Sequence, residues 1–331
     1  MTTKLKLLSA LAGLLFSGAT LAQTPDQRGD VQGFIQDMVE KHQFNPRSLQ
    51  QIFAQTEIRQ DILDAVVRPY EAKPWFKYQS IFVTDSRIAE GKAYLKQHQT
   101  TLKRAEQKYG VPAEIITAIL GVESRYGRYK GKFRLMDSLT TLGFDYPPRR
   151  KFYRNELEQF LLLSREEKLD PLSLTGSYAG AMGKAQFISS SYRHYAVDFD
   201  GDDVRDLLHS DADAIGSIAS YLKRHGWQRD EQIVYPASAA QTAAPKTGKA
   251  KYRLKPTQTV AQWRAQGVKP LSPLADEMKA AFFSLKTEQG HSHWLGLKNF
   301  YAITRYNHSP LYAMAVVQLA QAIKPDASAH K

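Results

Sequence analysis

The chain has 331 residues, of which 43% are hydrophobic and 11% aromatic, and it contains no cysteine. This composition excludes a disordered or collagen-like chain, and the lack of cysteine excludes disulfides, thiolate metal sites and cysteine nucleophiles. The 45 lysines and arginines against 33 aspartates and glutamates give a formal net charge of +12. Such a charge favours an acidic partner, although charge alone leaves simple solubility open as the alternative.

The first residues have the layout of a secretory signal peptide. Lys4 and Lys6 precede an apolar run over residues 7–16, and small residues lead to a cleavage site after Ala22. The run is too short to cross a bilayer, which takes roughly 20 apolar residues. Removal of residues 1–22 takes two lysines from the charge of +12 and leaves +10. We expect an exported protein whose anionic partner belongs to the cell envelope and is not nucleic acid.

Apolar residues at helical spacing predict helices over most of residues 30–228. In chain order, these are several helices over 30–108 that end with an amphipathic one at 92–108, a helix that begins at Val111-Pro112, a helix over 152–166 and a helix from Asp211 to Gly226. The glycine- and alanine-rich segment 175–186 between them is predicted to be a loop.

The pattern changes after Trp227. Short strands are predicted at 233–235, 252–254, 281–285 and 300–304, with a small helix at 260–266, an exposed loop at 237–251 and a final helix that begins at Ser309-Pro310. The sequence therefore predicts a mainly helical protein with a small sheet inserted late in the chain.

Glu123 is the first candidate for chemistry. It follows Ile119 and Leu120 by four and three residues, so its side chain leaves the expected helix on the apolar face. Burial and the negative end of the helix dipole both disfavour a carboxylate and are expected to raise its pKa. A carboxyl that is protonated near neutral pH can act as general acid on a glycosidic bond. The alternative is a structural ion pair with Arg125 or Arg128, and spacing alone leaves both interpretations open.

Two further segments carry groups suited to sugars. The first is Ser177-Tyr-Ala-Gly-Ala-Met-Gly183 with Gln186 beyond it, where small residues let a ligand approach the backbone and a hydroxyl and an amide can bind it. A flexible connection is the alternative for this segment. The second is Arg305-Tyr-Asn-His-Ser309, whose tyrosine and asparagine can stack on and hydrogen-bond an amino sugar. We interpret His308 as a capping or surface residue.

The segment Asp198-Phe-Asp200-Gly-Asp202 resembles the start of an EF-hand calcium loop, because carboxylates stand at positions 1, 3, 5 and 9. Val204 at position 7 would offer its carbonyl. The loop departs from the pattern at position 6, where Asp203 replaces glycine, and at position 12, where His209 replaces glutamate. Asp213, at position 16, can supply the bidentate carboxylate if the loop is enlarged. We favour a calcium site over a merely acidic loop.

Five separated motifs occur in one order: Gly121-Val-Glu-Ser-Arg-Tyr-Gly127, Phe144-Asp-Tyr-Pro147, Gly176-Ser-Tyr-Ala-Gly-Ala-Met-Gly183, Asp213-Ala-Ile-Gly-Ser217 and Tyr306-Asn-His-Ser309. Together they resemble the lytic murein transglycosylase B family, and the similarity runs from about residue 30 to the C-terminus. No single motif is specific, whereas five in the same order and spacing are.

The resemblance implies a mainly α (α+β) fold, with a lysozyme-like catalytic core beside an N-terminal helical domain and a small antiparallel β domain. The expected parts are a signal peptide at 1–22, the helical domain at 23–108, the core with its EF-hand-like loop at 109–228, the β domain at 229–294 and a segment at 295–331 that returns to the core.

The resemblance also implies a reaction on peptidoglycan. Glu123 would protonate the glycosidic oxygen between N-acetylmuramic acid and N-acetylglucosamine, while the substrate's acetamido group stabilises the cation at C1. The same residue, now a carboxylate, would take the proton of the C6 hydroxyl, which closes a 1,6-anhydro ring without water. A usual hydrolase would need two carboxyls that flank the bond.

Site residues are carried over position by position. The positions that match the family's glycan groove are Ser177, Gln186, Tyr221, Tyr306, Asn307 and Tyr312, and Arg149 matches one of two substrate-contacting arginines, with Pro148 at the other. The matching calcium ligands are Asp198, Asp200, Asp202 and Asp213, with the carbonyl of Val204. The calcium ion is expected to stabilise the fold, and no organic cofactor is implied.

The best-known members of the family that this chain resembles are lipoproteins attached through an N-terminal cysteine. Because this chain has no cysteine, we expect a soluble periplasmic protein without a lipid anchor. Its expected partners are the glycan strands of peptidoglycan and, as a further candidate, a cell-wall synthesis complex.

Two rival functions stay open at this point. One is lysozyme-type hydrolysis, with Asp137 or Asp145 as a second carboxylate. The other is a non-catalytic peptidoglycan-binding protein.

Overall fold

The computed structural model describes residues 24–67, 73–240 and 254–325. The predicted signal peptide, most of the predicted strand at 252–254 and most of the predicted loop at 237–251 lie outside these residues. The chain divides into two compact units, Met1–Ala54 and Gln55–Lys331. The domain limits expected at 108, 228 and 294 stay predictions.

The described part of the first unit is helical. It consists of η1 (Pro25–Gln27), α1 (Gly29–His42) and α2 (Pro46–Ala54). The apolar faces of α1 and α2 meet, and the rings of Phe34 and Phe53 pack edge to face with centroids 6.0 Å apart. Burial of these faces holds the two short helices together.

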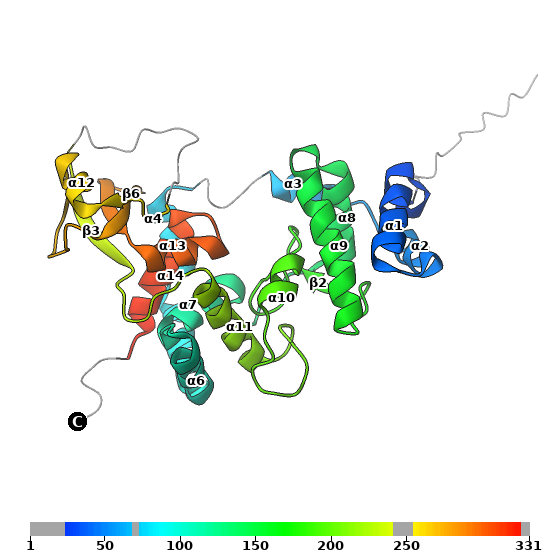
Figure 1. The fold of residues 1–331 in the computed structure, drawn as a ribbon, viewed down its shortest axis with the longest axis horizontal. Helices are drawn as coiled ribbons and strands as arrows, with labels where there is room; N and C mark the ends of the chain where they lie inside the picture. Colours follow the sequence, from blue (N-terminus) through cyan, green and yellow to red (C-terminus); the bar gives the residue numbers. More distant parts are fainter. Residues whose placement is uncertain (1–23, 68–72, 241–253, 326–331) are drawn as a thin grey trace, which may run out of the picture. The chain divides into compact units, whose positions relative to one another are not determined.

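The second unit contains most of the helices. Before the sheet these are α3 (Gln60–Val66), α4 (Trp75–Phe82), α5 (Asp85–Gln97), α6 (Gln99–Tyr109), α7 (Ala113–Ser124), α8 (Leu135–Asp145), η3 (Pro147–Arg149), α9 (Arg150–Glu166), α10 (Ser189–Tyr195) and α11 (Asp211–Arg224). The single helix predicted over 92–108 is wrong, because the backbone leaves helical geometry at His98 and separates α5 from α6. Helices α8 and α9 run side by side (Figure 1).

A five-stranded antiparallel sheet follows α11. Its strands β3 (Val234–Ala239), β4 (Gln258–Thr259), β5 (Val268–Pro270), β6 (Lys279–Thr287) and β7 (Gly290–Gly296) lie in the order β4-β6-β7-β3-β5. Helix α12 (Val260–Ala265) begins with a capping box between Thr259 and Gln262. The prediction of a mainly helical protein with a small antiparallel sheet is confirmed.

The strand predicted at 300–304 is wrong, because these residues belong to helix α13 (Lys298–Tyr306). Phe300 and Ile303 are both fully buried, and the Phe300 ring stacks on Phe283 of β6 at 4.6 Å. A five-residue apolar run does not by itself separate a strand from a buried helix. The final helix α14 (Pro310–Ile323) begins at Ser309, as predicted.

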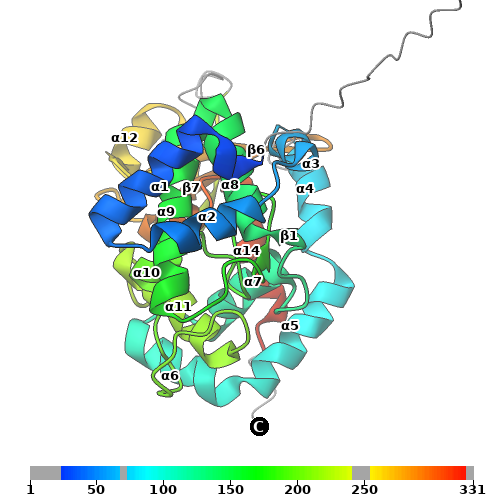
Figure 2. The same cartoon turned by 90° about the vertical axis from the view of Figure 1, so that its right-hand side faces the viewer.

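Three segments distant in sequence meet in the second unit. Helix α14 packs along α7, as both views show (Figures 1 and 2). The two-stranded pair β1 (Phe133–Arg134) and β2 (Thr175–Gly176) places the start of the glycine-rich loop beside the segment that follows α7. The end of α7, this loop and the junction of α13 with α14 together form the frame of the site.

No helix within the described ranges is both long and apolar enough to cross a membrane.

Candidate functional site

The end of helix α7 is fixed by a sharp reversal of the chain. Arg125 and Tyr126 adopt left-handed backbone conformations with φ of 49° and 60°. The Tyr126 ring then covers Gly121, where a Cβ atom would lie 2.7 Å from the tyrosine hydroxyl. Only glycine leaves room for this ring. The motif from Gly121 to Gly127 therefore holds the last residues of α7, Glu123 among them, in one orientation.

Glu123 is half-buried near the end of α7, and its Oε1 accepts a hydrogen bond from the hydroxyl of Tyr312 at 2.6 Å. Tyr312 is 2% exposed, and burial together with the charge of Glu123 raises its pKa, so the hydroxyl stays protonated and donates. Arg125 and Arg128 both bind the carboxylate of Glu90 at 2.8 Å. The two arginines that were considered as alternative ion-pair partners of Glu123 thus pair with Glu90.

Two further tyrosines extend from this pair. The ring of Tyr306 stacks nearly parallel to that of Tyr312, at 6.3 Å and 12°, and its hydroxyl donates to the carbonyl of Ala185 at 2.5 Å. Tyr221 of α11 meets Tyr306 edge to face at 4.9 Å. Burial raises the pKa of Tyr306, and the charge of Glu123 adds to the effect. These rings are therefore neutral and packed against one another.

The glycine-rich loop closes on itself and on the end of α7. Gly183 has φ of +71°, and a Cβ there would lie 2.4 Å from the carbonyl oxygen of Leu207. The hydroxyl of Ser124 donates to the carbonyl of Lys184 at 2.6 Å and accepts from the amide of Gly127 at 2.9 Å. One buried serine therefore joins the loop to the helix of Glu123.

Gln186 and Ser177 play different parts in this loop. Gln186 has a left-handed φ of 48°, and its amide Nε2 donates to the carbonyls of Gly183 and Lys130 at 2.9 and 3.2 Å. The hydroxyl oxygen of Ser177 accepts from backbone amides of its own loop, among them that of Ala181 at 3.0 Å. Ser177 thus stabilises the turn, whereas Gln186 lines a cavity.

A cavity of about 960 Å³ lies beside the tyrosines. Of the predicted substrate-binding residues, the structure places Arg149, Gln186, Tyr221 and Tyr306 on its walls. Glu123 and Tyr312 adjoin it through the stacked ring of Tyr306, and neither they nor Ser177 nor Asn307 are among its lining residues. The guanidinium of Arg149 lies over the ring of Phe152 at 4.1 Å.

The cavity also has aromatic walls that the sequence analysis did not assign. His225 stacks on Tyr221 at 4.0 Å, Tyr195 meets Tyr221 edge to face at 4.7 Å, and Phe187 lies 5.5 Å from Tyr221. Burial lowers the pKa of His225 and favours its neutral form. His225 follows Tyr221 by four residues, the spacing of neighbours on one helix face. That spacing was the signal available in the sequence.

The carboxylates considered for a second catalytic role have other partners or positions. Asp137 is 2% exposed and accepts two hydrogen bonds from Arg134, at 2.8 and 2.9 Å, and one from the amide of Glu57. Asp145 is the last residue of α8 and does not line the cavity. The carboxylate found among the described residues that line the cavity is that of Glu166. It accepts two hydrogen bonds from Arg193, which lower its pKa.

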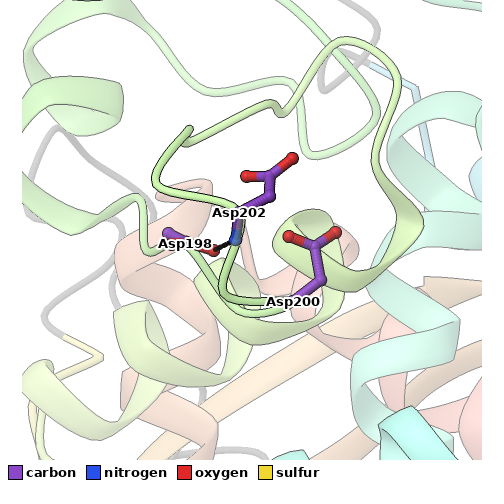
Figure 3. Close-up of side chains that lie close together, drawn as sticks. All are labelled: Asp198, Asp200 and Asp202. Atoms are coloured by element: carbon purple, nitrogen blue, oxygen red, sulfur yellow. Dashed lines mark hydrogen bonds between the residues drawn. The ribbon is translucent and has the colours of Figure 1, made fainter.

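The EF-hand-like loop gathers three of the predicted ligands. Carboxylate oxygens of Asp198, Asp200 and Asp202 lie within 4.8 Å of one another, on one turn of the loop (Figure 3). Asp203, which stands where glycine is expected, adopts φ of 68°. Aspartate tolerates this left-handed conformation better than most residues, so the departure at position 6 does not prevent the turn.

Asp213, the other predicted carboxylate ligand, is not among these clustered carboxylates. It is fully buried, and its two carboxylate oxygens accept from the amides of Phe199 and Asp206 at 2.6 and 2.7 Å. Burial raises its pKa. The amide of Val204 donates to Asp202. Clustered carboxylate oxygens are the donor set that Ca²⁺ prefers, so the residues present fit a hard cation.

Comparisons with known proteins give a single family. The family model described as the transglycosylase SLT domain matches residues 26–321. Over 316 residues the chain is 42% identical to the membrane-bound lytic murein transglycosylase B of Escherichia coli (strain K12). The alignment covers 92% of this chain and 84% of that protein.

Solved structures agree with this match. The lytic transglycosylase SltB1 from Pseudomonas aeruginosa is 46% identical, with a TM-score of 0.83 over 90% of this chain and 98% of that one. The Escherichia coli lytic transglycosylase Slt35 in complex with calcium is 43% identical, with a TM-score of 0.81 over 88% and 91%. The lysozyme-like fold expected from the sequence is confirmed. The chain belongs to the family of lytic transglycosylases that carry the transglycosylase SLT domain.

Proposed function

We propose that Glu123 is the catalytic acid and base of this lytic transglycosylase, and that the glycan strand of peptidoglycan lies in the cavity beside it. The enzyme cleaves peptidoglycan by transglycosylation. The observation that carries the assignment is the hydrogen bond between Glu123 and Tyr312 beside the cavity wall. The carboxylate of Glu166, which lines the described part of that wall, is already bound by Arg193.

The reaction needs one proton donor that later accepts a proton. Protonated Glu123 gives its proton to the glycosidic oxygen, the bond from C1 to that oxygen breaks, and the substrate's acetamido group stabilises C1. The carboxylate then removes the proton of the C6 hydroxyl while this oxygen bonds to C1. Glu123 ends in its starting form, and no water is consumed. Tyr312 keeps the carboxyl in place between the two proton transfers, and Tyr306, Tyr221 and Gln186 hold the sugars.

Substitution Glu123→Gln tests the assignment. We expect turnover to fall about 10²–10⁴-fold, because the amide neither gives nor takes the proton, while the melting midpoint stays near that of the wild type. Glu114→Gln in the first turn of the same helix is the matched control, since this carboxylate lies at the opposite end of α7 from Glu123 and 3.7 Å from Lys324. Mass spectrometry of muropeptides identifies the product. Reducing ends in place of the lighter anhydro ends would favour lysozyme-type hydrolysis, and unchanged wall lysis by Glu123→Gln would remove Glu123 from its role.

A structural calcium ion is the second part of the proposal. Asp198, Asp200 and Asp202 would hold it through side-chain oxygens, with the carbonyl of Val204 and the carboxylate of Asp213 completing the ligands. The clustered carboxylates and the calcium bound to the relative Slt35 support this assignment.

Thermal unfolding tests the calcium site. After treatment with a chelator, we expect millimolar Ca²⁺ to raise the melting midpoint, because a ligand bound only to the folded state stabilises it. Asp200→Asn should reduce this shift, whereas Asp276→Asn, an exposed residue that pairs with Arg264, should not. A midpoint that does not respond to Ca²⁺ would contradict the proposal.

We also propose that the mature protein acts in the periplasm without a lipid anchor. The leader-like residues 1–22 and the absence of cysteine from the whole sequence support this location. Cell fractionation checks it, and recovery in the membrane fraction after a salt wash would contradict it. A cell-wall synthesis complex as partner stays a prediction.

A further inference from the structure

A second, smaller cavity of about 370 Å³ adjoins the glycan cavity. Arg305 and His308 line both cavities and form the wall between them. Lys255, which is exposed, and Tyr301 line the smaller cavity beyond that wall. The larger cavity therefore continues past Arg305 and His308 into a recess beside α13.

The two permanent cations of this recess, Arg305 and Lys255, have no carboxylate partner among the described residues. Arg305, His308 and Lys255 form no ion pair or side-chain hydrogen bond with any residue that the structure describes. The guanidinium of Arg305 lies 5.8 Å from the ring centre of Tyr301, which positions the charge without neutralising it. Elsewhere in this unit, arginines that line a cavity can be paired, as Arg193 is with Glu166.

His308 lies close enough to the arginines for their charges to affect its protonation. Burial lowers the pKa of His308, and the charges of Arg305 and Arg149 lower it further. His225 on the glycan side adds to this effect. His308 therefore favours its neutral form, which can still donate a hydrogen bond, and Arg305 and Lys255 carry the charge of the recess. Unpaired cations at a concave surface typically bind an anion.

We propose that Arg305, His308 and Lys255 bind a carboxylate of the peptide stem that is attached to the muramic acid unit next to the cleaved bond. This inference rests on the proposed function, because it takes the glycan to lie in the larger cavity. The sugar backbone is uncharged, so the anionic groups of peptidoglycan that are close to a bound strand belong to its substituents. A guanidinium can bind a carboxylate through two parallel hydrogen bonds, and a nearby lysine adds charge without fixing the geometry.

The test compares three glycan substrates of equal length. One carries stem peptides with free carboxylates, one carries the same stems with these carboxylates converted to amides, and one has its stems removed, which exposes the lactyl carboxylate. The variants are Arg305→Gln, His308→Gln and Lys255→Gln. Arg264→Gln is the matched control, because Arg264 lies on α12 and pairs with Asp276 at the surface.

We expect the wild type to prefer free-carboxylate stems over amidated stems by about tenfold in kcat/KM, the value of one charge-assisted contact. The difference should lie in KM, since binding and not chemistry is affected. The ratio should approach one in Arg305→Gln, fall less in His308→Gln and Lys255→Gln, and stay unchanged in Arg264→Gln. The exposed Lys255 variant gives a readout even if Arg305→Gln does not fold.

Two results would overturn the proposal. One is equal activity of the wild type on the free and amidated stems. The other is a loss in the variants that is confined to stripped strands, which would assign the recess to the lactyl carboxylate. Neither result affects the proposed reaction, because anhydro products from any of the three substrates still identify a transglycosylase. Failure of that reaction would instead appear as the absence of anhydro ends on all of them.

Discussion

A single hydroxyl group connects Glu123 to a helix that begins nearly 190 residues later in the chain. Tyr312 donates to Oε1 at 2.6 Å from the first turn of α14, which Ser309 caps through its side chain. Because the tyrosine is buried, close packing restricts its ring. The protein itself therefore orients the carboxyl, as the proposed role of Glu123 requires.

Tyr312→Phe should lower kcat by about 10–100-fold, since a hydrogen bond to a charged group contributes about 1.5–3 kcal/mol. The ring volume is conserved, so the melting midpoint should change little. Tyr235→Phe in β3 is the matched control. Steady-state rates of anhydromuropeptide release check this prediction, and a kcat equal to that of the wild type would show that Tyr312 has no positioning role.

Some of the site at this scale could be predicted from the sequence, and some could not. The motif around Glu123 and the tyrosine at position 306 could be predicted, because each lies in a short segment with a characteristic pattern. The ion pairs of Arg125 and Arg128 with Glu90 could not be predicted, because Glu90 belongs to α5 and precedes Arg125 by 35 residues. Ser177 has the residue type expected of a sugar ligand, yet its hydroxyl oxygen serves its own turn. Local spacing carries no information about such competing partners.

At the scale of elements, the glycine-rich loop depends on backbone that passes very close to other backbone. Gly183 lies against Leu207, and the amide of Lys184 donates to the same Leu207 carbonyl at 2.8 Å. The loop that carries Gln186 is therefore fixed to the EF-hand-like loop on one side and to Ser124 on the other.

Gly183→Ala should destabilise the protein by more than about 1 kcal/mol, because alanine is strained at φ of +71° and its Cβ would clash with Leu207. Activity of the folded fraction should also fall, since Gln186 would shift. Gly33→Ala in α1 is the control, because a Cβ there meets nothing within 4 Å, and it should be neutral or slightly stabilising. Denaturant unfolding measures both variants. Equal loss in both would contradict the argument from close approach.

Periodicity gave no prediction for α8 and a wrong one, a strand, for residues 300–304 of α13. In α8, every residue from Leu135 to Phe144 is buried, so the helix has no polar face and shows no amphipathic period. In α13, the apolar run over 300–304 is too short to reveal its period. Sequence periodicity detects half-buried elements of several turns, whereas α8 is buried on all sides and the apolar run in α13 covers little more than one turn.

At the scale of the whole molecule, ion pairs join helices that are distant in sequence. Glu90 of α5 binds two arginines after α7, and Glu166 of α9 binds Arg193 of α10. The neighbouring arginines lower the pKa of both carboxyls below the ordinary value of 4.5. A carboxyl with a lowered pKa stabilises the folded state above its unfolded pKa, and this contribution is lost as the pH falls through the folded value.

We therefore expect the free energy of unfolding to fall as the pH is lowered below about 4.5, the ordinary pKa of glutamate. The Glu90→Gln, Glu166→Gln double variant should be less stable near pH 7 and should show a flatter dependence on acid. Glu288→Gln, in the exposed turn between β6 and β7, should follow the wild type. Urea unfolding between pH 3 and 7 provides the curves, and parallel curves for the double variant and the wild type would contradict the prediction.

The place of α14 in the chain has a consequence for how the enzyme is made. Glu123 is translated long before Tyr312, and Tyr306, Asn307 and α14 are the last parts of the site to leave the ribosome. A nascent chain can fold α7 and still lack the group that orients its carboxyl. The carboxyl of Glu123 is thus oriented only after residue 312 has been synthesised.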